Sequence, residues 1–307
     1  MVERLSGVEA RIGSVRQLST IVTAMRGIAV AHSREARQHL AGVRTYADAI
    51  GVAIGEALSL LPASPATVNT SGGEAVVAFC TEQGFAGTFN ERVLDAVEAF
   101  SNERAGHPPA LLLVGDRGLM IAGERGLAVE WSAPMIAHVD EAAQLAERII
   151  DALYDRLEAG AISEVTVIHT ALVPAGRIDI VTKRLIPFDY QRFQLARLTE
   201  APLITLPPQR LLEGLAQEYV FAELCEAVII SFAAENEART RAMIAAKDNV
   251  SRKLDDLTAL ARQLRQEEIT NEVIELADQA DDPAGSTGAR ASSGRSRRTA
   301  QDRAGPE

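Results

Sequence analysis

Hydrophobic residues in the first sixty positions recur every three or four residues, in a stripe that runs from Leu5 to Leu58. This spacing predicts a helix with one narrow apolar face, and Pro62 predicts its end. A helix of about 57 residues would be roughly 85 Å long. Glycines such as Gly51 and Gly55 each cost about 1 kcal/mol against alanine, unless they permit another helix to approach closely.

A second helical pattern lies near the other end of the chain. Residues 209–282 contain no proline, and their apolar stripe runs from Leu211 to Leu276. About 70 helical residues would extend roughly 105 Å. A lone amphipathic helix of that length cannot hide its stripe from water, so we expect the two helices to cover each other as an antiparallel coiled coil. The near-3.5 period predicts a left-handed twist.

The middle of the chain alternates between short apolar runs and helical patterns. We expect strands at 75–81, 110–115 and 165–169, helices at 90–104 and 139–157, and an edge strand at 177–186. This order predicts the α/β class, with a Rossmann-like, mostly parallel sheet and helices on its faces. The expected domains are an N-terminal helix (1–61), the α/β domain (74–200), a C-terminal helix (209–278) and a disordered Arg-rich tail (283–307).

The amino-acid composition argues against several classes of protein. The 307 residues carry 31 Lys and Arg against 42 Asp and Glu, a net charge of -11, which argues against a broad cationic surface for nucleic acid. No apolar run approaches the ~20 residues of a membrane span. With only Cys80 and Cys225, neither a disulfide framework nor a zinc ribbon is expected. The N-terminus shows no secretory signal, and a cytoplasmic setting fits the sparse cysteines.

The sequence contains few patterns that are typical of a catalytic, nucleotide-binding or metal-binding site. The turn from Gly84 to Gly87 follows a strand and precedes a helix, the context for binding phosphate, but it lacks the glycine-rich nucleotide motifs. The histidines have no metal-ligand spacing, and no glycine elbow surrounds a serine. Cys80 and Cys225 are interpreted as core residues. His32 and His39 share a helix face and are interpreted as a polar patch. We therefore expect no catalytic residue, no cofactor and no metal.

Three segments carry a resemblance to a known family. The run from Arg11 to Met25, including its Ala-Met, the block Ala245-Ala-Lys-Asp-Asn249 with Ala238-Arg239, and the ending Arg265 to Leu276 resemble the gamma subunit of F-type ATP synthases. The ending has the pattern Arg-Gln-x-x-Ile-Thr-x-Glu. The glycine-rich turn at 83–90 is also similar to the family's. The resemblance covers residues 2 to about 278.

The resemblance implies a role as central rotor shaft, a non-catalytic subunit on the cytoplasmic face of the bacterial membrane. The coiled coil would lie inside a ring of three alpha and three beta subunits, and the α/β domain would lie beside the epsilon subunit and the c-ring. Residues that match the family's coupling contacts to the ring are Met25, Arg239, Gln266, Thr270 and Glu275. As an alternative, Arg239 and Glu275 are solvated coiled-coil charges.

Departures from the family pattern point to a divergent member, such as the gamma subunit of an alternative F-type ATPase. The lysines usual around Ala-Met are replaced by the run Ser19 to Thr23, and the Arg-rich tail suggests the hypothesis of a brake or assembly clamp. Two other functions stay open at this point. One is a coiled-coil scaffold or adaptor with a non-catalytic α/β domain, and the other is a small-molecule enzyme built on that domain.

Overall fold

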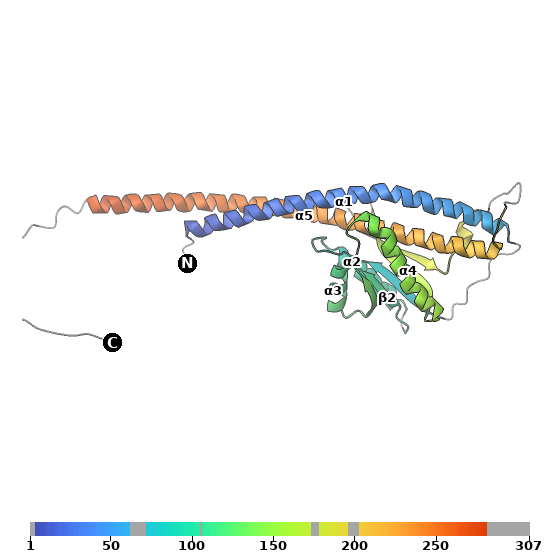
Figure 1. Ribbon diagram of the computed structural model, residues 1–307. Coiled ribbons are helices and arrows are strands. Elements are labelled where there is room, and N and C mark those ends of the chain that lie inside the picture. Colours follow the sequence, from blue (N-terminus) through green and yellow to red (C-terminus); the bar gives the residue numbers. More distant parts are fainter. Residues whose placement is uncertain (1–3, 62–71, 105, 173–177, 196–202, 281–307) are drawn as a thin grey trace, which may run out of the picture. The chain divides into compact units, whose positions relative to one another are not determined.

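The computed structural model describes residues 4–61, 72–104, 106–172, 178–195 and 203–280, without the side chains of the last three (Figure 1). The predicted tail at 283–307 lies outside the described residues, and so does the hypothesis about it.

The described residues form two compact units. One contains 4–13 and 255–280, and the other contains 14–254 apart from the gaps given above. Helices α1 (Leu5–Ser59) and α5 (Pro208–Ala280) each contribute to both units. The two long helices predicted from the apolar stripes are therefore present.

Ion pairs show that α1 and α5 run antiparallel. In the larger unit, Arg44 on α1 pairs with Glu226 on α5 at 2.7 Å, and Arg37 pairs with Glu237, so α5 numbers rise as α1 numbers fall. In the smaller unit, Arg265 lies 2.5 Å from Glu9. Its buried apolar side chains also come from both helices, and they are Val8, Ile12, Leu257 and Ala261. The predicted antiparallel pairing is confirmed.

The glycines of α1 differ in how closely other parts of the chain approach them. A Cβ added at Gly7, Gly13, Gly27 or Gly42 would meet nothing within 4 Å, so no neighbour requires glycine there. A Cβ at Gly55, by contrast, would lie 2.2 Å from the backbone oxygen of Gln194, and one at Gly51 would lie 3.3 Å from the ring of Phe193. The close approach predicted for these glycines is therefore made at the end of α1, by the segment after β5 rather than by a helix.

The central sheet has five strands in the order β3-β2-β1-β4-β5. Four of them are parallel, and β5 pairs with β4 in the antiparallel sense. The strands are β1 (Gly73–Phe79), β2 (Ala110–Val114), β3 (Val129–Ala133), β4 (Ile162–Leu172) and β5 (Ile178–Ile186). The three predicted strands and the edge strand are confirmed. Strand β3 was not predicted. It is only five residues long, its apolar residues alternate with polar ones, and it lies at the edge of the sheet.

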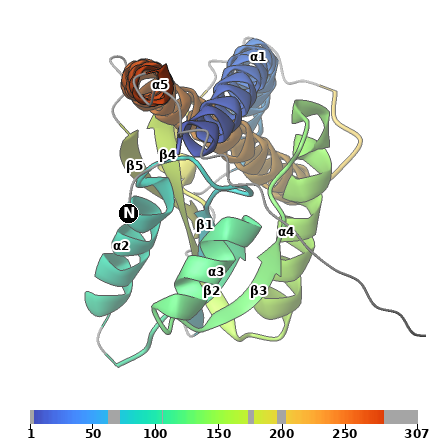
Figure 2. The same ribbon diagram turned by 90° about the vertical axis from the view of Figure 1, so that its left-hand side faces the viewer.

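Helices cover both faces of the sheet (Figure 2). Helices α2 (Phe89–Asn102) and α3 (Asp116–Glu124) pack on one face, and α4 (Ala142–Glu158) packs on the other together with α5. Short 3-10 turns, η1 (Val139–Glu141) and η3 (Tyr190–Arg192), precede α4 and follow β5. Successive residues of β1 alternate between the two cores, as the period of a strand requires.

The middle of α5 is buried almost all round. Between Ala222 and Arg239 only Glu226 and Glu237 are more than slightly exposed. Residues 224–233 join the core shared with α1, α4 and the sheet, while Ala234 and Ala238 join the core beneath α2. Because this stretch of α5 is surrounded by the sheet and by other helices, it anchors the central domain to α1 and α5.

We expect Gly118→Ala to destabilise the central domain. An added Cβ would lie 2.1 Å from Cβ of Cys80, and this overpacking of a closed core costs about 1–3 kcal/mol. Gly123 in the same helix is the matched control, because its Cβ would meet nothing within 4 Å and alanine is the better helix former. Thermal unfolding should show a lower Tm for Gly118→Ala alone. Equal Tm values for the two variants would contradict the close packing.

Candidate functional site on the long helices

Arg239 points into the protein. Only 8% of its surface is exposed, and its guanidinium donates to the carboxylate of Glu235, to Oδ1 of Asn236 at 3.1 Å and to the backbone oxygen of Gly84 at 3.4 Å. Glu235 lies one helical turn before Arg239, a favourable spacing for the ion pair. Burial raises the pKa of the Glu235 carboxyl, although the charge of Arg239 acts in the opposite direction. Arg239 is therefore neither solvated nor exposed on the helix surface.

At the end of β1, the carboxylate of Glu82 lies against two backbone N–H groups. In Rossmann-like folds, ligands bind at the carboxyl ends of the strands, where a helix begins. Here the Glu82 carboxylate accepts the backbone N–H of Met135 at 2.7 Å and that of Asp116, the first residue of α3, at 3.2 Å. The turn itself is tight, with a positive φ of 64° at Phe85 and 62° at Gly87. Just before this turn, the Glu82 carboxylate thus accepts the first backbone N–H of α3, a position that suits an anion.

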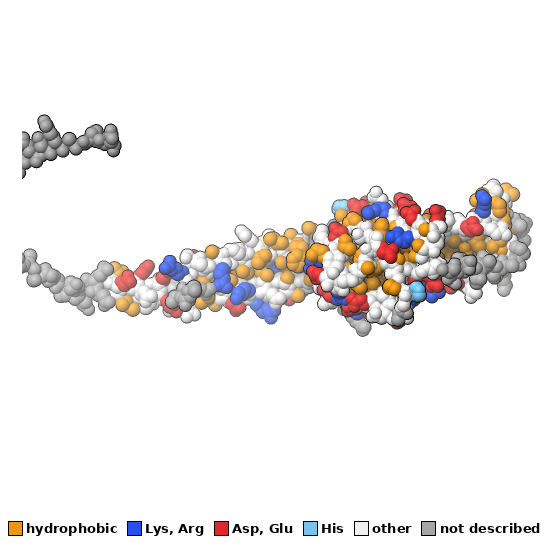
Figure 3. Space-filling view, turned by 90° about the horizontal axis from the view of Figure 1, so that it is seen from below, with side chains coloured by type: hydrophobic (Ala, Val, Ile, Leu, Met, Phe, Trp, Pro, Cys, Tyr) orange, Lys and Arg blue, Asp and Glu red, His pale blue; other side chains and the backbone are white. Residues whose placement is uncertain are grey.

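Met25 lies in an exposed apolar stripe of α1. Met25 itself is half-buried, and Leu18, Ile21 and Ile28, at helical spacing on either side, are each more than half exposed. Figure 3 shows hydrophobic side chains gathered on the helix pair beside the central domain. No charged residue occurs from Gln17 to Met25. The stripe of α1 that contains Met25 is therefore apolar and carries no charge of its own between Gln17 and Met25.

The other three predicted contact residues lie in the smaller unit. Gln266, Thr270 and Glu275 are exposed on the last part of α5. The Thr270 hydroxyl donates to the backbone oxygen of Gln266 at 2.7 Å, and both residues line an open surface groove. The groove is lined by Gln263, Gln266, Glu267, Thr270 and Asn271. The structure therefore brings Gln266 and Thr270 together on one exposed polar surface.

A second buried carboxylate on α5 was not predicted from the sequence. Glu223 is 7% exposed, and it pairs with Lys183 of β5 and with Arg192 of η3, at 2.9 Å for Arg192. Burial alone would raise the pKa of this carboxyl, but hydrogen bonds from Lys183, Tyr219 and Arg192 lower it below its ordinary value. The only sign of this buried carboxylate in the sequence is a glutamate within the apolar stripe of a predicted helix. Its partners could not be read from spacing, because they lie 40 and 31 residues away.

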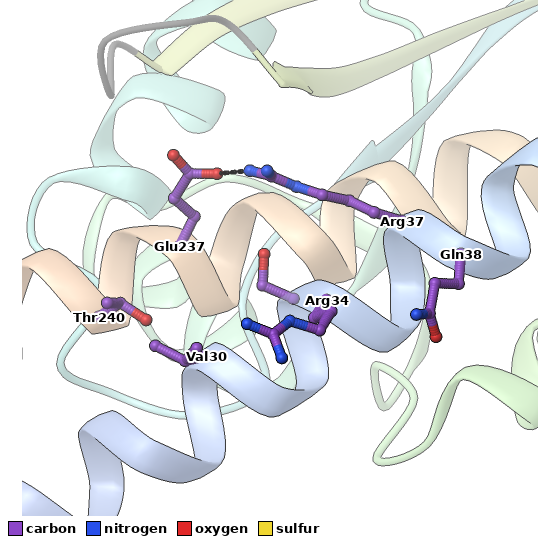
Figure 4. A pocket seen from close by; sticks show the side chains of 7 residues that line it. Val30, Arg34, Arg37, Gln38, Glu237 and Thr240 are labelled. Atoms are coloured by element: carbon purple, nitrogen blue, oxygen red, sulfur yellow. Dashed lines mark hydrogen bonds and ion pairs between the residues drawn. The ribbon is translucent and has the colours of Figure 1, made fainter.

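A groove between α1 and α5 contains a further ion pair. Figure 4 shows Arg37 reaching Glu237 across the groove, which Arg34 also lines. The groove has a volume of about 480 Å³ and is open to solvent. Because Arg37 and Glu237 are both partly exposed, this pair contributes little to stability.

The interpretation of the cysteines as core residues is confirmed. Cys80 and Cys225 are buried free thiols, and burial raises the pKa of both. Among the histidines, His32 packs against Phe232 with ring centroids 5.6 Å apart, so only His39 of the predicted polar patch is exposed. Within the described residues, no group of His, Cys, Asp and Glu could hold a metal ion. No helix in the same part of the chain is long and apolar enough to cross a membrane.

Comparisons with known proteins agree with the resemblance seen in the sequence. The model of the family described as ATP synthase matches residues 4–280. The ATP synthase gamma chain of Frankia casuarinae is 29% identical over 290 residues, which cover 90% of this chain and 96% of the relative. That of Bifidobacterium longum is 26% identical over 294 residues, covering 89% and 96%. The chain belongs to the ATP synthase gamma family.

Solved structures of mitochondrial ATP synthases share the fold of this gamma chain. A chain of the Euglena gracilis OSCP/F1/c-ring structure matches with a TM-score of 0.62 and 14% identity, covering 93% of this chain and 98% of that one. A chain of the Tetrahymena thermophila central stalk and c-ring matches with a TM-score of 0.53 and 18% identity, covering 74% and 99%. This gamma chain is a non-catalytic subunit of ATP synthase, the central rotor stalk.

We expect Arg239→Ala and Gln266→Ala to differ in their effect on the isolated gamma chain. Removing Arg239 leaves the Glu235 carboxylate buried without its ion-pair partner, which costs about 3–5 kcal/mol. Gln266 is exposed, so its truncation should change the free energy of unfolding by less than about 0.5 kcal/mol. Chemical denaturation measures both. A wild-type midpoint for Arg239→Ala would show that the buried pair does not hold in solution.

We expect Glu223→Gln to lower stability at neutral pH and to approach the wild type in acid. Because the folded-state pKa of Glu223 is depressed, the ionised carboxylate stabilises the fold above about pH 4.3, the ordinary glutamate pKa. This contribution, about 2 kcal/mol for hydrogen bonds to a charged group, is lost as the pH falls through the folded-state pKa. Urea midpoints between pH 7 and pH 3 measure the difference. A gap that widens in acid would contradict the depressed pKa.

Proposed function

We propose that this gamma chain is the torque-transmitting shaft that couples ion flow through the membrane sector to the catalytic states of the beta subunits. The helix pair lies within a ring of three alpha and three beta subunits. The central domain lies beside the epsilon subunit and the c-ring, at the cytoplasmic face of a bacterial membrane. Family membership over residues 4–280 is the observation that carries this proposal.

The exposed apolar side chains near the end of α5 support the proposal that other subunits enclose this part of the helix. Ile269, Val273, Ile274 and Leu276 are each more than half exposed on consecutive turns of the helix. Contiguous apolar side chains on a protein surface mark a site of contact with another protein. A surrounding ring of subunits would cover this end from every side.

A shaft changes the state of its ring only through unequal contacts. A ligand that binds every state equally shifts none of them, and the same holds for a subunit that touches three sites in turn. In this proposal Met25, Gln266, Thr270 and Glu275 contact the ring. Met25 offers an adaptable apolar surface, and Gln266 can donate to acidic or carbonyl groups. Arg239 contributes through the turn at Gly84, to which it donates.

The test is co-expression of this chain with the cognate alpha and beta subunits. We expect one gamma chain for each hexameric ring by size-exclusion chromatography and mass measurement. A Gln266→Ala, Thr270→Ala double variant should assemble but lose most of its ATPase activity, because the polar contacts that distinguish ring states are removed. Ser251→Ala, an exposed polar change elsewhere on α5, is the control and should retain activity.

Two results would contradict the proposal. A chain that stays monodisperse and ignores the ring would favour the scaffold function. A double variant with full activity would instead show that the coupling contacts lie elsewhere on the shaft.

A further inference from the structure

Two buried carboxylates mark the two ends of the contact between α5 and the central sheet. Glu223 and Glu235 lie on α5 about three turns apart, roughly 18 Å along the helix axis. The residues between them are mostly apolar and belong to the core that α5 shares with the sheet. Both carboxylates are more than nine-tenths buried, and both have partners outside α5.

At one end, Glu223 holds the edge of the sheet. Its two carboxylate oxygens accept from different elements, Oε2 from the ammonium group of Lys183 on β5 and Oε1 from the guanidinium of Arg192 on η3. Arg192 also donates to the hydroxyl of Tyr219, one turn earlier on α5, at 2.6 Å. The side chain of Glu223 is therefore fixed from two directions.

At the other end, Glu235 and Arg239 hold the turn that follows β1. Oε2 of Glu235 accepts the backbone N–H of Glu82 at 3.4 Å, and Arg239 donates to the oxygen of Gly84. The Glu82 side chain continues this chain of hydrogen bonds to the start of α3 and to Met135 beyond β3. This end of the contact is thus connected to the turn after β1, to the start of α3 and to the segment after β3.

Apolar packing fixes the rotation of α5 on the sheet only through the fit of side-chain shapes. Hydrophobic burial is non-directional, so a helix buried all round retains nearly the same buried area after a small turn about its axis. Charge-assisted hydrogen bonds depend on distance and angle, and so they define one rotational setting. Buried ion pairs gain little net stability over apolar residues of similar volume, which leaves geometry as their main contribution.

We propose that Glu223 and Glu235, with Lys183, Arg192 and Arg239, form a torque junction that fixes the rotation of α5 relative to the central domain. These are positioning residues, because their bonds are to one another and to the backbone of this chain. The inference rests on the proposed rotor function, in which torque passes between the central domain and the helix pair. A shaft that turned within its domain would dissipate that torque.

The test replaces the buried ion pairs by apolar residues of similar size. A junction variant combines Glu223→Leu, Lys183→Met, Glu235→Leu and Arg239→Met, so that packing is kept and directional bonds are lost. The complete complex is reconstituted in lipid vesicles, and ATP-driven ion pumping is measured beside ATP hydrolysis. We expect ATP hydrolysis to continue while the number of ions pumped for each ATP hydrolysed falls to a small fraction of the wild-type value.

A matched control separates the junction from other ion pairs of α5. Glu237→Leu with Arg37→Met removes a pair between α5 and α1 that does not involve the central domain. We expect this variant to keep the wild-type ratio of pumping to hydrolysis. Thermal unfolding of each isolated chain shows whether the substitutions preserve the fold.

A second variant covers the case in which the junction variant does not fold. Glu223→Gln with Glu235→Gln keeps the shape of both side chains and weakens the charge-assisted bonds, so a smaller loss of pumping for each ATP is expected. A folded variant of either kind with the wild-type ratio would overturn the inference. Failure of the rotor function itself is distinguishable, because the wild-type complex would then show no coupled pumping before any substitution is made.

Discussion

The burial of the middle of α5 is the constraint on which the rest of the structure depends. This stretch completes one core with α1, α4 and the sheet, and it reaches the second core beneath α2 through Ala234 and Ala238. Without it, the part of the inner face of the sheet that α4 does not cover and the α1 side chains of this core would both be exposed to water. Because one helical segment covers both surfaces, the central domain and the stretches of α1 and α5 within residues 14–254 form one compact unit.

The surroundings of α5 change along its length. Its middle is enclosed by the chain's own side chains, whereas Ile269, Val273 and Ile274 near its end are apolar and exposed. Sequence periodicity looks similar in both stretches, but among the residues that the structure describes only the first stretch is covered on all sides. The same helix therefore contributes to internal stability in one part and presents an external contact surface in another.

Much of the fold was predictable because its signals are local. Apolar stripes without proline predicted both long helices, and short apolar runs predicted β1, β2 and β4. The direction of a side chain was not predictable in this way. The family motif identified Arg239, but a charged residue on a long helix carries no local sign that it points inward to Glu235 and Gly84. Glu223 was missed for a related reason, because its cationic partners come from β5 and η3.

The position of α5 in the chain affects the order in which the protein can fold during synthesis. Residues of β1, β2 and β4 that form the inner face of the sheet, among them Val77, Leu112 and Val167, precede the middle of α5 in sequence. Until residues 224–233 have left the ribosome, this apolar face has no cover from α5, even though every strand has been made. The nascent chain therefore exposes an aggregation-prone surface late in translation, which is the circumstance in which a chaperone is needed.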